Sequence, residues 1–310
     1  MKKILCLIAV VLIVAGGVLM AATFPTMYAE RQRDKNNYTT VSEPIAGHYD
    51  SIEIHAENAD IALTNAGDAK PSVEAKTDPV YKITVTQEKG KLLIEETDLR
   101  KWYQKIGIFS PKPGKIEVKL ADGIYPELNV KGVNGDIDIQ ADLQTVSFET
   151  IMAETTNGDT KVHIPVDFVS VKSVNGDISF VIVSGTDPVT GFGQSNVVLG
   201  KTTNGHIIDS SIAAIKSLTT GNGSIHTSGA NTGMAKLYVR TANGDIELDR
   251  IYGQDIDVES VNGDVTASLW RPMACTATTK NGRITIPEES GEYLLKISTV
   301  NGDITVELAD

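Results

Sequence analysis

The sequence predicts an all-β protein whose residues 128–310 form a single-stranded β-solenoid of about nine coils. The first observation behind this prediction is the dipeptide Asn-Gly, which recurs at intervals of 18 to 29 residues, most of them close to 20. A step of about 20 residues fits one turn of a solenoid. The second observation is that apolar residues alternate with polar ones on both sides of each pair, as in strands with one buried face. The nine asparagines are Asn134, Asn157, Asn175, Asn204, Asn222, Asn243, Asn262, Asn281 and Asn301.

The first element along the chain is an apolar segment at residues 4–24, which has 21 residues and no charge. About 20 apolar residues span a bilayer core, whereas the apolar part of a signal peptide needs only about 7–15. We therefore expect one transmembrane signal anchor, with residues 1–3 as a cytoplasmic tail and the rest of the chain outside the cytoplasm. The alternative is a cleaved signal peptide, which would make the protein secreted. Residues 25–44 are polar and without periodicity, and they predict a linker.

Residues 45–127 predict an N-terminal β section that is strand-like but not regularly repeated. Residues 81–85 and 91–94 alternate around Glu88-Lys89-Gly90, which predicts a hairpin. Residues 58–61 resemble a degenerate copy of the Asn-Gly corner. We expect this section to cap one end of the solenoid, because an unpaired sheet edge would otherwise recruit other chains.

In the repeat itself, the same class of side chain returns at the same distance from each corner. Aliphatic residues lie four before the Asn and three after it, and Thr or Ser lies two before it in most coils, as in Val171, Ser173 and Ile178 around Asn175. A sandwich of β-hairpins is the alternative, since Asn-Gly is also a hairpin turn signal. Hairpins would vary in strand length and turn chemistry, so the regular offsets favour the solenoid. Gly supplies the positive φ of a tight corner, and aligned Asn amides can bond from coil to coil.

An aspartate follows the corner glycine in six of the nine coils, at Asp136, Asp159, Asp177, Asp245, Asp264 and Asp303. A row of carboxylates at strand spacing suggests either cation binding or acceptance of hydrogen bonds from turn amides. The nine-residue calcium-binding repeat is absent, and no coil gathers several oxygen ligands. We therefore favour the hydrogen-bonding role and predict no metal site. His206 and His226 fall on adjacent coils without a third ligand, and Cys275 is predicted to face the core.

These motifs together resemble a known family. The order S-I-E-I at residues 51–54, I-E-V-K-L at residues 116–120 and then repeated V-N-G-D-I is similar to the bacterial "putative adhesin" family, which includes the LiaG-like envelope proteins and is related to the head GIN domain proteins. The resemblance covers roughly residues 50–310. It implies a β-solenoid and an extracytoplasmic location, and it carries over no catalytic residues.

Two excursions from the repeat are candidate binding loops. The coil between Asn175 and Asn204 is about ten residues longer than the others and carries Asp187 and Phe192. Extra residues that leave a solenoid are a usual place for binding. Residues 100–109 are basic and aromatic, with Trp102 and Tyr103, and they could contact a partner or lipid headgroups. The alternative for this second segment is a loop that packs against the cap.

Composition narrows the function without naming a ligand. The formal charge of −12 argues against a nucleic-acid partner. No nucleophile elbow, zinc-protease or phosphate-loop motif occurs, so we predict no catalytic residues and no cofactor. We expect a membrane-anchored, adhesin-like binding or scaffold module of the cell envelope that engages a surface protein or a cell-wall glycan. The alternatives are an accessory protein of envelope-stress signalling and a polysaccharide lyase or hydrolase on a β-helix.

Overall fold

The computed structural model describes residues 9, 12–14, 16–18, 37–100, 111–140, 145–182, 197–228 and 234–309. The chain divides into two compact units, Met1–Thr39 and Thr40–Asp310. Most of the predicted anchor, residues 4–24, lies outside the described residues, and those of it that are described are helical. None of the helical segments in the described ranges has both the length and the apolar character needed to cross a membrane.

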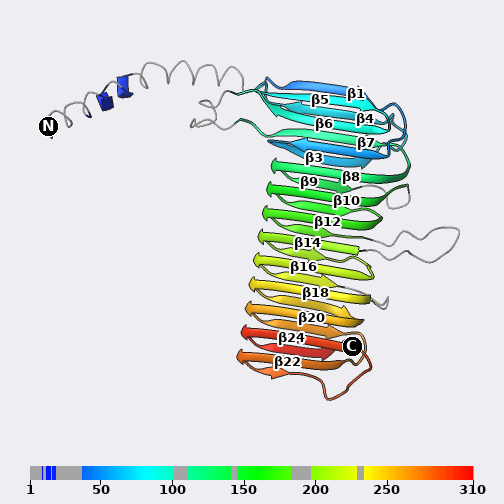
Figure 1. Cartoon of the computed structure of the whole chain (residues 1–310), viewed down its shortest axis with the longest axis vertical. Helices are drawn as coiled ribbons and strands as arrows, with labels where there is room; N and C mark the ends of the chain where they lie inside the picture. The colour runs from blue at the N-terminus through cyan, green and yellow to red at the C-terminus, as the bar shows by residue number, and fades with distance from the viewer. Residues whose placement is uncertain are drawn as a thin grey trace. The chain divides into compact units, whose positions relative to one another are not determined.

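The second unit is built from two large sheets that face each other (Figure 1). Sheet A has 13 strands in the spatial order β1 (Thr39–Pro44), β4 (Ser72–Thr77), β7 (Gly114–Leu120), β3 (Ala59–Asn65), β9 (Ile137–Gln140), β11 (Thr160–His163), β13 (Ile178–Phe180), β15 (Ile207–Asp209), β17 (Ile225–Ser228), β19 (Ile246–Ile251), β21 (Val265–Leu269), β25 (Ile304–Leu308) and β23 (Ile284–Thr285). Sheet B has 12 strands in the order β22 (Ala274–Asn281), β24 (Leu294–Asn301), β20 (Gly253–Asn262), β18 (Met234–Asn243), β16 (Ile215–Asn222), β14 (Val197–Asn204), β12 (Val166–Asn175), β10 (Val146–Asn157), β8 (Gly123–Asn134), β2 (Ser51–Ala56), β6 (Lys91–Asp98) and β5 (Tyr81–Glu88).

Each coil of the repeat contributes one strand to sheet B, turns at Asn-Gly and returns in sheet A. Neighbouring coils pair in parallel and in register, so that Asn157 lies beside Asn134 on one side and Asn175 on the other. In most coils the aliphatic residue three after the Asn points inward and is buried, as at Ile178 and Ile207. The predicted all-β solenoid is therefore confirmed: period-two strands bury one face between two sheets, and each coil stacks on its neighbours.

The stacking order departs from the chain order at the C-terminal end. The last coil, β24–β25, inserts between β20–β21 and β22–β23, so the coil of Asn281 is outermost. The inward residues explain this exchange. Leu295 and Ile297 of β24 are fully buried, whereas the matching residues of β22 are the smaller Cys275 and Ala277, which are only partly buried. The coil with the larger apolar side chains occupies the fully buried place.

The N-terminal end carries a cap of different construction. The coil β2–β3 stacks on β8–β9, and β6–β7 lies beyond it. Two strands then add in antiparallel fashion, β5 on β6 and β4 on β7. The predicted hairpin is the β5–β6 pair, in which Glu88 lies opposite Lys91.

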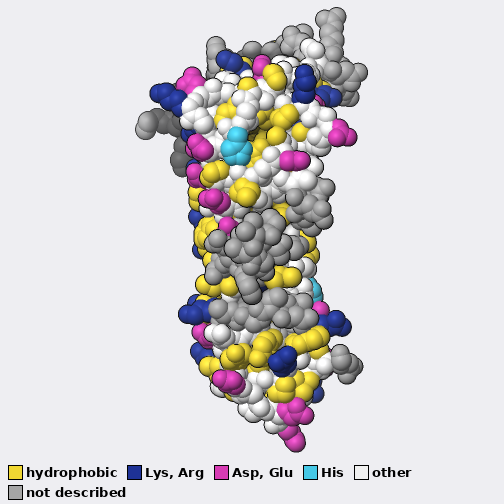
Figure 2. Space-filling view, turned by 90° about the vertical axis from the view of Figure 1, so that its right-hand side faces the viewer, with side chains coloured by type: hydrophobic (Ala, Val, Ile, Leu, Met, Phe, Trp, Pro, Cys, Tyr) yellow, Lys and Arg dark blue, Asp and Glu magenta, His cyan; other side chains and the backbone are white. Residues whose placement is uncertain are grey.

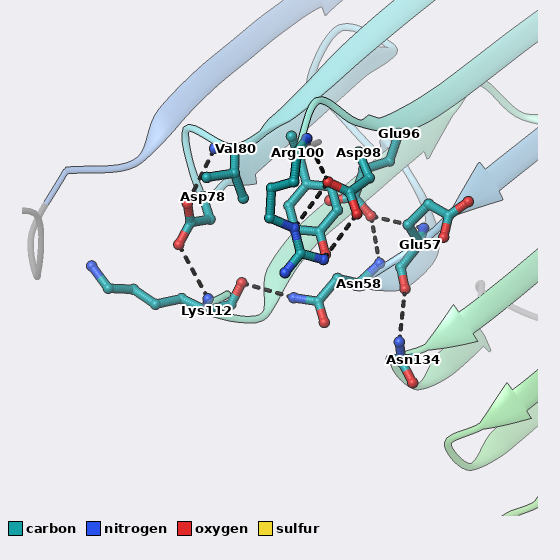
Figure 3. A network of polar contacts seen from close by, with 10 residues as sticks. Glu57, Asn58, Asp78, Val80, Glu96, Asp98, Arg100, Lys112 and Asn134 are labelled. Carbon is teal, nitrogen blue, oxygen red and sulfur yellow. Dashed lines mark hydrogen bonds and ion pairs between the residues drawn. The ribbon is translucent and has the colours of Figure 1, made fainter. Parts of the chain in front are cut away.

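A buried carboxylate completes the cap (Figure 3). One oxygen of Glu96, Oε2, accepts hydrogen bonds from the backbone amides of Glu57, Asn58 and Ala59 at 2.9, 2.7 and 3.1 Å. The other, Oε1, accepts the hydroxyl of Thr77 at 2.8 Å. In the repeat, the Asn-Gly corner of the neighbouring coil supplies acceptors for corner amides. The coil β6–β7, which lies beyond β2–β3, has no Asn-Gly corner, and Glu96 supplies the acceptors in its place.

We expect Glu96→Gln to lower the free energy of unfolding by about 2 kcal/mol, because the amide removes charge from three backbone hydrogen bonds and brings an NH₂ group into a site that needs acceptors. Urea unfolding of the full chain measures this change. The matched control is Glu95→Gln on the preceding residue, whose side chain is 46% exposed and lies 3.9 Å from His55. An equal effect of the two substitutions would contradict the capping role.

Candidate binding surface

The corners of the stacked coils form a continuous ladder of asparagine side chains. The Nδ2 group of each Asn donates to Oδ1 of the Asn in the neighbouring coil, at 2.7 to 2.9 Å. The ladder starts at Asn134, whose Nδ2 donates to the carbonyl of Glu57 at 3.2 Å, and it joins all nine predicted asparagines. Such amide ladders hold stacked strands in register. The corner row is thus a structural spine that fixes the surfaces beside it.

The aspartates that follow the corner glycines form a second ladder. Oδ1 of each accepts the backbone amide of the equivalent residue one coil further on, as in Asp159 N to Asp136 Oδ1 at 2.8 Å and Asp177 N to Asp159 Oδ1 at 2.8 Å. At two of the three positions where Asp is replaced, the substitute still accepts: Nδ1 of His206 receives the amide of Ser224 at 3.0 Å, and Oγ of Ser224 receives the amide of Asp245 at 3.2 Å. This is the backbone-acceptor role that the sequence favoured over cation binding. His226 instead contacts Glu247 at 3.1 Å.

Small hydroxyl side chains support the corner from inside. Thr220 and Thr241 donate to the carbonyl oxygens of Gly205 and Gly223 in the preceding coil, at 2.8 and 2.9 Å. The hydroxyl therefore satisfies a partly buried carbonyl oxygen of the neighbouring corner.

The outer face of sheet B presents exposed apolar and charged side chains beside these ladders. Immediately before the corner lies an exposed apolar row, which we call the valine row: Val133, Val174, Val261 and Val300 are 38%, 43%, 46% and 39% exposed. Two residues earlier in each strand lies the charged row, which comprises Lys131, Glu154, Lys172, Lys201, Arg240 and Glu259 in consecutive register apart from Thr219. Exposed apolar residues in line, flanked by polar ones, are typical of interaction sites.

Charges within this face are partly paired. Lys172 Nζ lies 2.8 Å from Glu154 Oε1, and this hydrogen bond lowers the pKa of the Glu154 carboxyl. Arg240 Nε lies 3.2 Å from Glu259. Between the charged and valine rows lies a shallow surface groove of about 370 Å³, lined by Lys131, Gly132, Glu154, Thr155, Thr156, Lys172, Ser173 and Val174. The face thus offers apolar contact at the four exposed valines and charges of both signs to orient a partner.

Both predicted binding loops fall outside the described residues, namely Trp102 and Tyr103 in one and Asp187 and Phe192 in the other. Asp98 and Arg100 lie just before the first of these loops (Figure 3). Arg100 makes a bidentate contact with Asp98, at 2.9 and 3.0 Å, and its guanidinium lies 5.6 Å from the ring centre of Tyr81. Burial raises the pKa of Tyr81 to about 12, so its hydroxyl stays neutral.

The interior holds a charged pair that the sequence analysis missed. Lys216 Nζ lies 2.8 Å from Asp209 Oδ2, and both side chains are at most 1% exposed. Thr227 donates to Asp209 Oδ2 at 2.6 Å, Ser211 donates to Oδ1, and Lys216 also donates to the carbonyl of Ser228 at 3.1 Å. The signal was present: both charges sit at offsets from the corner where other coils carry aliphatic or aromatic residues, such as Leu237 and Leu248.

Comparison with known families decides the classification. The family model described as Toastrack DUF4097 matches residues 49–310. The chain belongs to the Toastrack DUF4097 family. The match begins just before β2 and runs to the end of the repeat, so the cap and the solenoid together make up the Toastrack region. No curated protein matches the sequence.

Several solved structures are similar to this Toastrack chain. A putative adhesin from Parabacteroides merdae is 11% identical, with a TM-score of 0.39, and the match covers 89% of this chain and 97% of that one. A putative lipid binding protein from Parabacteroides distasonis is 13% identical, with a TM-score of 0.40 and coverage of 89% and 98%. A putative cell adhesion protein from Clostridium sporogenes is 7% identical, with a TM-score of 0.30 and coverage of 88% and 100%.

Proposed function

We propose that this chain is an extracytoplasmic binding module, held at the membrane by residues 4–24, which presents the outer face of sheet B to an extended partner of the cell envelope. The partner is a surface protein or a cell-wall glycan. The observation that carries the proposal is the charged row, which runs through consecutive coils apart from Thr219 and is flanked at three of these coils by exposed valines of the valine row. Solenoids use such long, regular faces for binding.

The chemistry of the face favours binding over catalysis. The exposed valines give apolar contact to sugar rings or aliphatic side chains, and the paired charges beside them give orientation. The aspartates that could act as acids recur in six of the nine coils and accept hydrogen bonds from backbone amides. Their shared role is architectural, since a catalytic acid is one or two residues in a groove and not a row along an edge.

Binding of the full chain to isolated cell walls and to envelope fragments that retain surface proteins tests the proposal. We expect Val174→Asp combined with Lys172→Glu to lower the amount bound by tenfold or more, because the change places three like charges around the groove. The control is Thr266→Asp, at an exposed position of β21 on the other sheet. Equal loss from both variants, or loss from neither, would contradict the assignment of this face.

A further inference from the structure

The C-terminal end of the solenoid is open. β22 and β23 are the outermost strands of the two sheets, and each pairs with only one neighbour within the described part of the chain. Ile284 and Ile286, at inward positions of this coil, are 43% and 41% exposed, whereas the equivalent Ile304 and Val306 one coil inward are 0% and 3% exposed. The stack therefore ends on an apolar cross-section and two free strand edges.

The other end differs. There the inward residues of β5, the outermost strand of sheet B, are Tyr81 and Ile83, which are only 5% and 7% exposed. In addition, Glu96 accepts hydrogen bonds from the corner amides. A second copy cannot continue the apolar stack from this capped end. Because only one end of the solenoid is open, a second copy can join it only through its own open end. This favours a closed pair over a filament.

The charges around the open end identify what covers it. Lys280 and Arg283 lie at the corner side of this coil, where Arg283 is paired with Asp303 at 2.9 Å, so that these three residues leave a net positive charge there. Glu288, Glu289 and Glu292 lie in the connection from β23 to β24 at the opposite side. That connection is the loop below the last strands in Figure 1, and Figure 2 shows acidic side chains at the same end of the molecule. The end is thus self-complementary, basic on one side and acidic on the other.

We infer that the open C-terminal coil, β22–β23, is the docking surface for a second copy of this chain, which joins it end to end about a twofold axis. Two twofold arrangements bring these ends together. The one that pairs β22 with the antiparallel β22 of the second copy sets the basic corner of each against the acidic loop of the other. The alternative sets corner against corner and opposes like charges. The first arrangement also buries Ile284 and Ile286 and pairs both free edges.

Charge exchange in the full chain tests the inference by mass photometry and sedimentation velocity. We expect the unaltered chain to form a dimer of twice the chain mass at micromolar concentration. Lys280→Glu forms one variant, which leaves the internal pair of Arg283 with Asp303 intact and makes the corner net negative. Glu288→Lys with Glu289→Lys forms the other. Each variant alone is expected to dimerise at least tenfold more weakly, because its corner and its loop then carry the same sign.

An equal mixture of the two variants is expected to recover the dimer as a heterodimer, since each corner then meets a loop of opposite sign. Recovery on mixing also shows that both variants are folded. The inference would be overturned if the unaltered chain were monomeric at about 50 µM. It would also be overturned if the charge changes did not weaken the dimer, or if mixing the two variants did not restore it. A monomer would point to a strand from another protein as the occupant of the edge.

Discussion

We expect Gly158→Ala to lower the free energy of unfolding by about 3–5 kcal/mol, a large share of the stability of an ordinary domain. Gly158 is a corner glycine with φ of +146°, a backbone conformation that L side chains rarely adopt. Its added Cβ would also overlap the carbonyl group of Gly135 in the neighbouring coil, which is backbone and cannot rotate away. Urea and thermal unfolding of the full chain measure the loss.

The matched control is Gly132→Ala, in the adjacent coil but before the corner. Its φ is ordinary, and an added Cβ would meet Thr155 Oγ1 at 3.4 Å and Ile137 at 3.7 Å, which are normal contacts. We expect a change of less than about 1 kcal/mol. If Gly158→Ala proved as mild as this control, the close approach of successive corners would be wrong.

Lys216→Ala is expected to destabilise the chain by about 3–5 kcal/mol, because it leaves the buried carboxylate of Asp209 without its cation. Asp209 would keep hydrogen bonds from Ser211 and Thr227, but these do not neutralise its charge. The variant should therefore gain stability as the pH falls and the orphaned carboxyl takes up a proton, relative to the unaltered chain. Unfolding at two pH values measures both effects.

A triple variant tests whether apolar side chains that fill the same volume can replace the ion pair. Asp209→Val, Lys216→Leu and Thr227→Val place the kind of residue found in neighbouring coils at all three inward positions, and Thr227 is included because its hydroxyl would lose its acceptor. We expect it to recover at least half of the loss caused by Lys216→Ala, since buried ion pairs are often replaceable by packed apolar groups. A triple variant less stable than Lys216→Ala would show that the pair is net stabilising.

The period of the sequence was sufficient to predict the repeat region of the fold. The corner dipeptide, the inward aliphatic rows and the hydroxyl row each occupy fixed offsets, and stacking in register follows because parallel strands of equal length place equal offsets side by side. The antiparallel hairpin in the cap was also predictable, since Glu88-Lys89-Gly90 separates two alternating segments.

Other features depend on competition in three dimensions. The last two coils exchange places because the inward Leu295 is larger than the equivalent Cys275 and occupies the fully buried position. This depends on a comparison between two coils and not on a local pattern. The cap residue Glu96 lies at least 37 residues from the amides that it binds. The sequence analysis did not predict the valine row, because a single apolar residue before a corner does not change the alternation of apolar and polar residues along the strand. The pair Asp209–Lys216 could have been found as two charges at inward offsets.

Distances between spin labels along the valine row give the most direct test of the stacked, in-register corners. The native cysteines of the full chain are first replaced. Two cysteines that carry spin labels are then introduced, one at Val133 and one at a further position immediately before a corner. With about 4.8 Å per coil, the backbone separation from Val133 should be about 29 Å at Val261, about 34 Å at Val300 and about 38 Å at Lys280. Separations that do not grow in equal steps, or a Lys280 position closer to Val133 than Val300 is, would contradict the account.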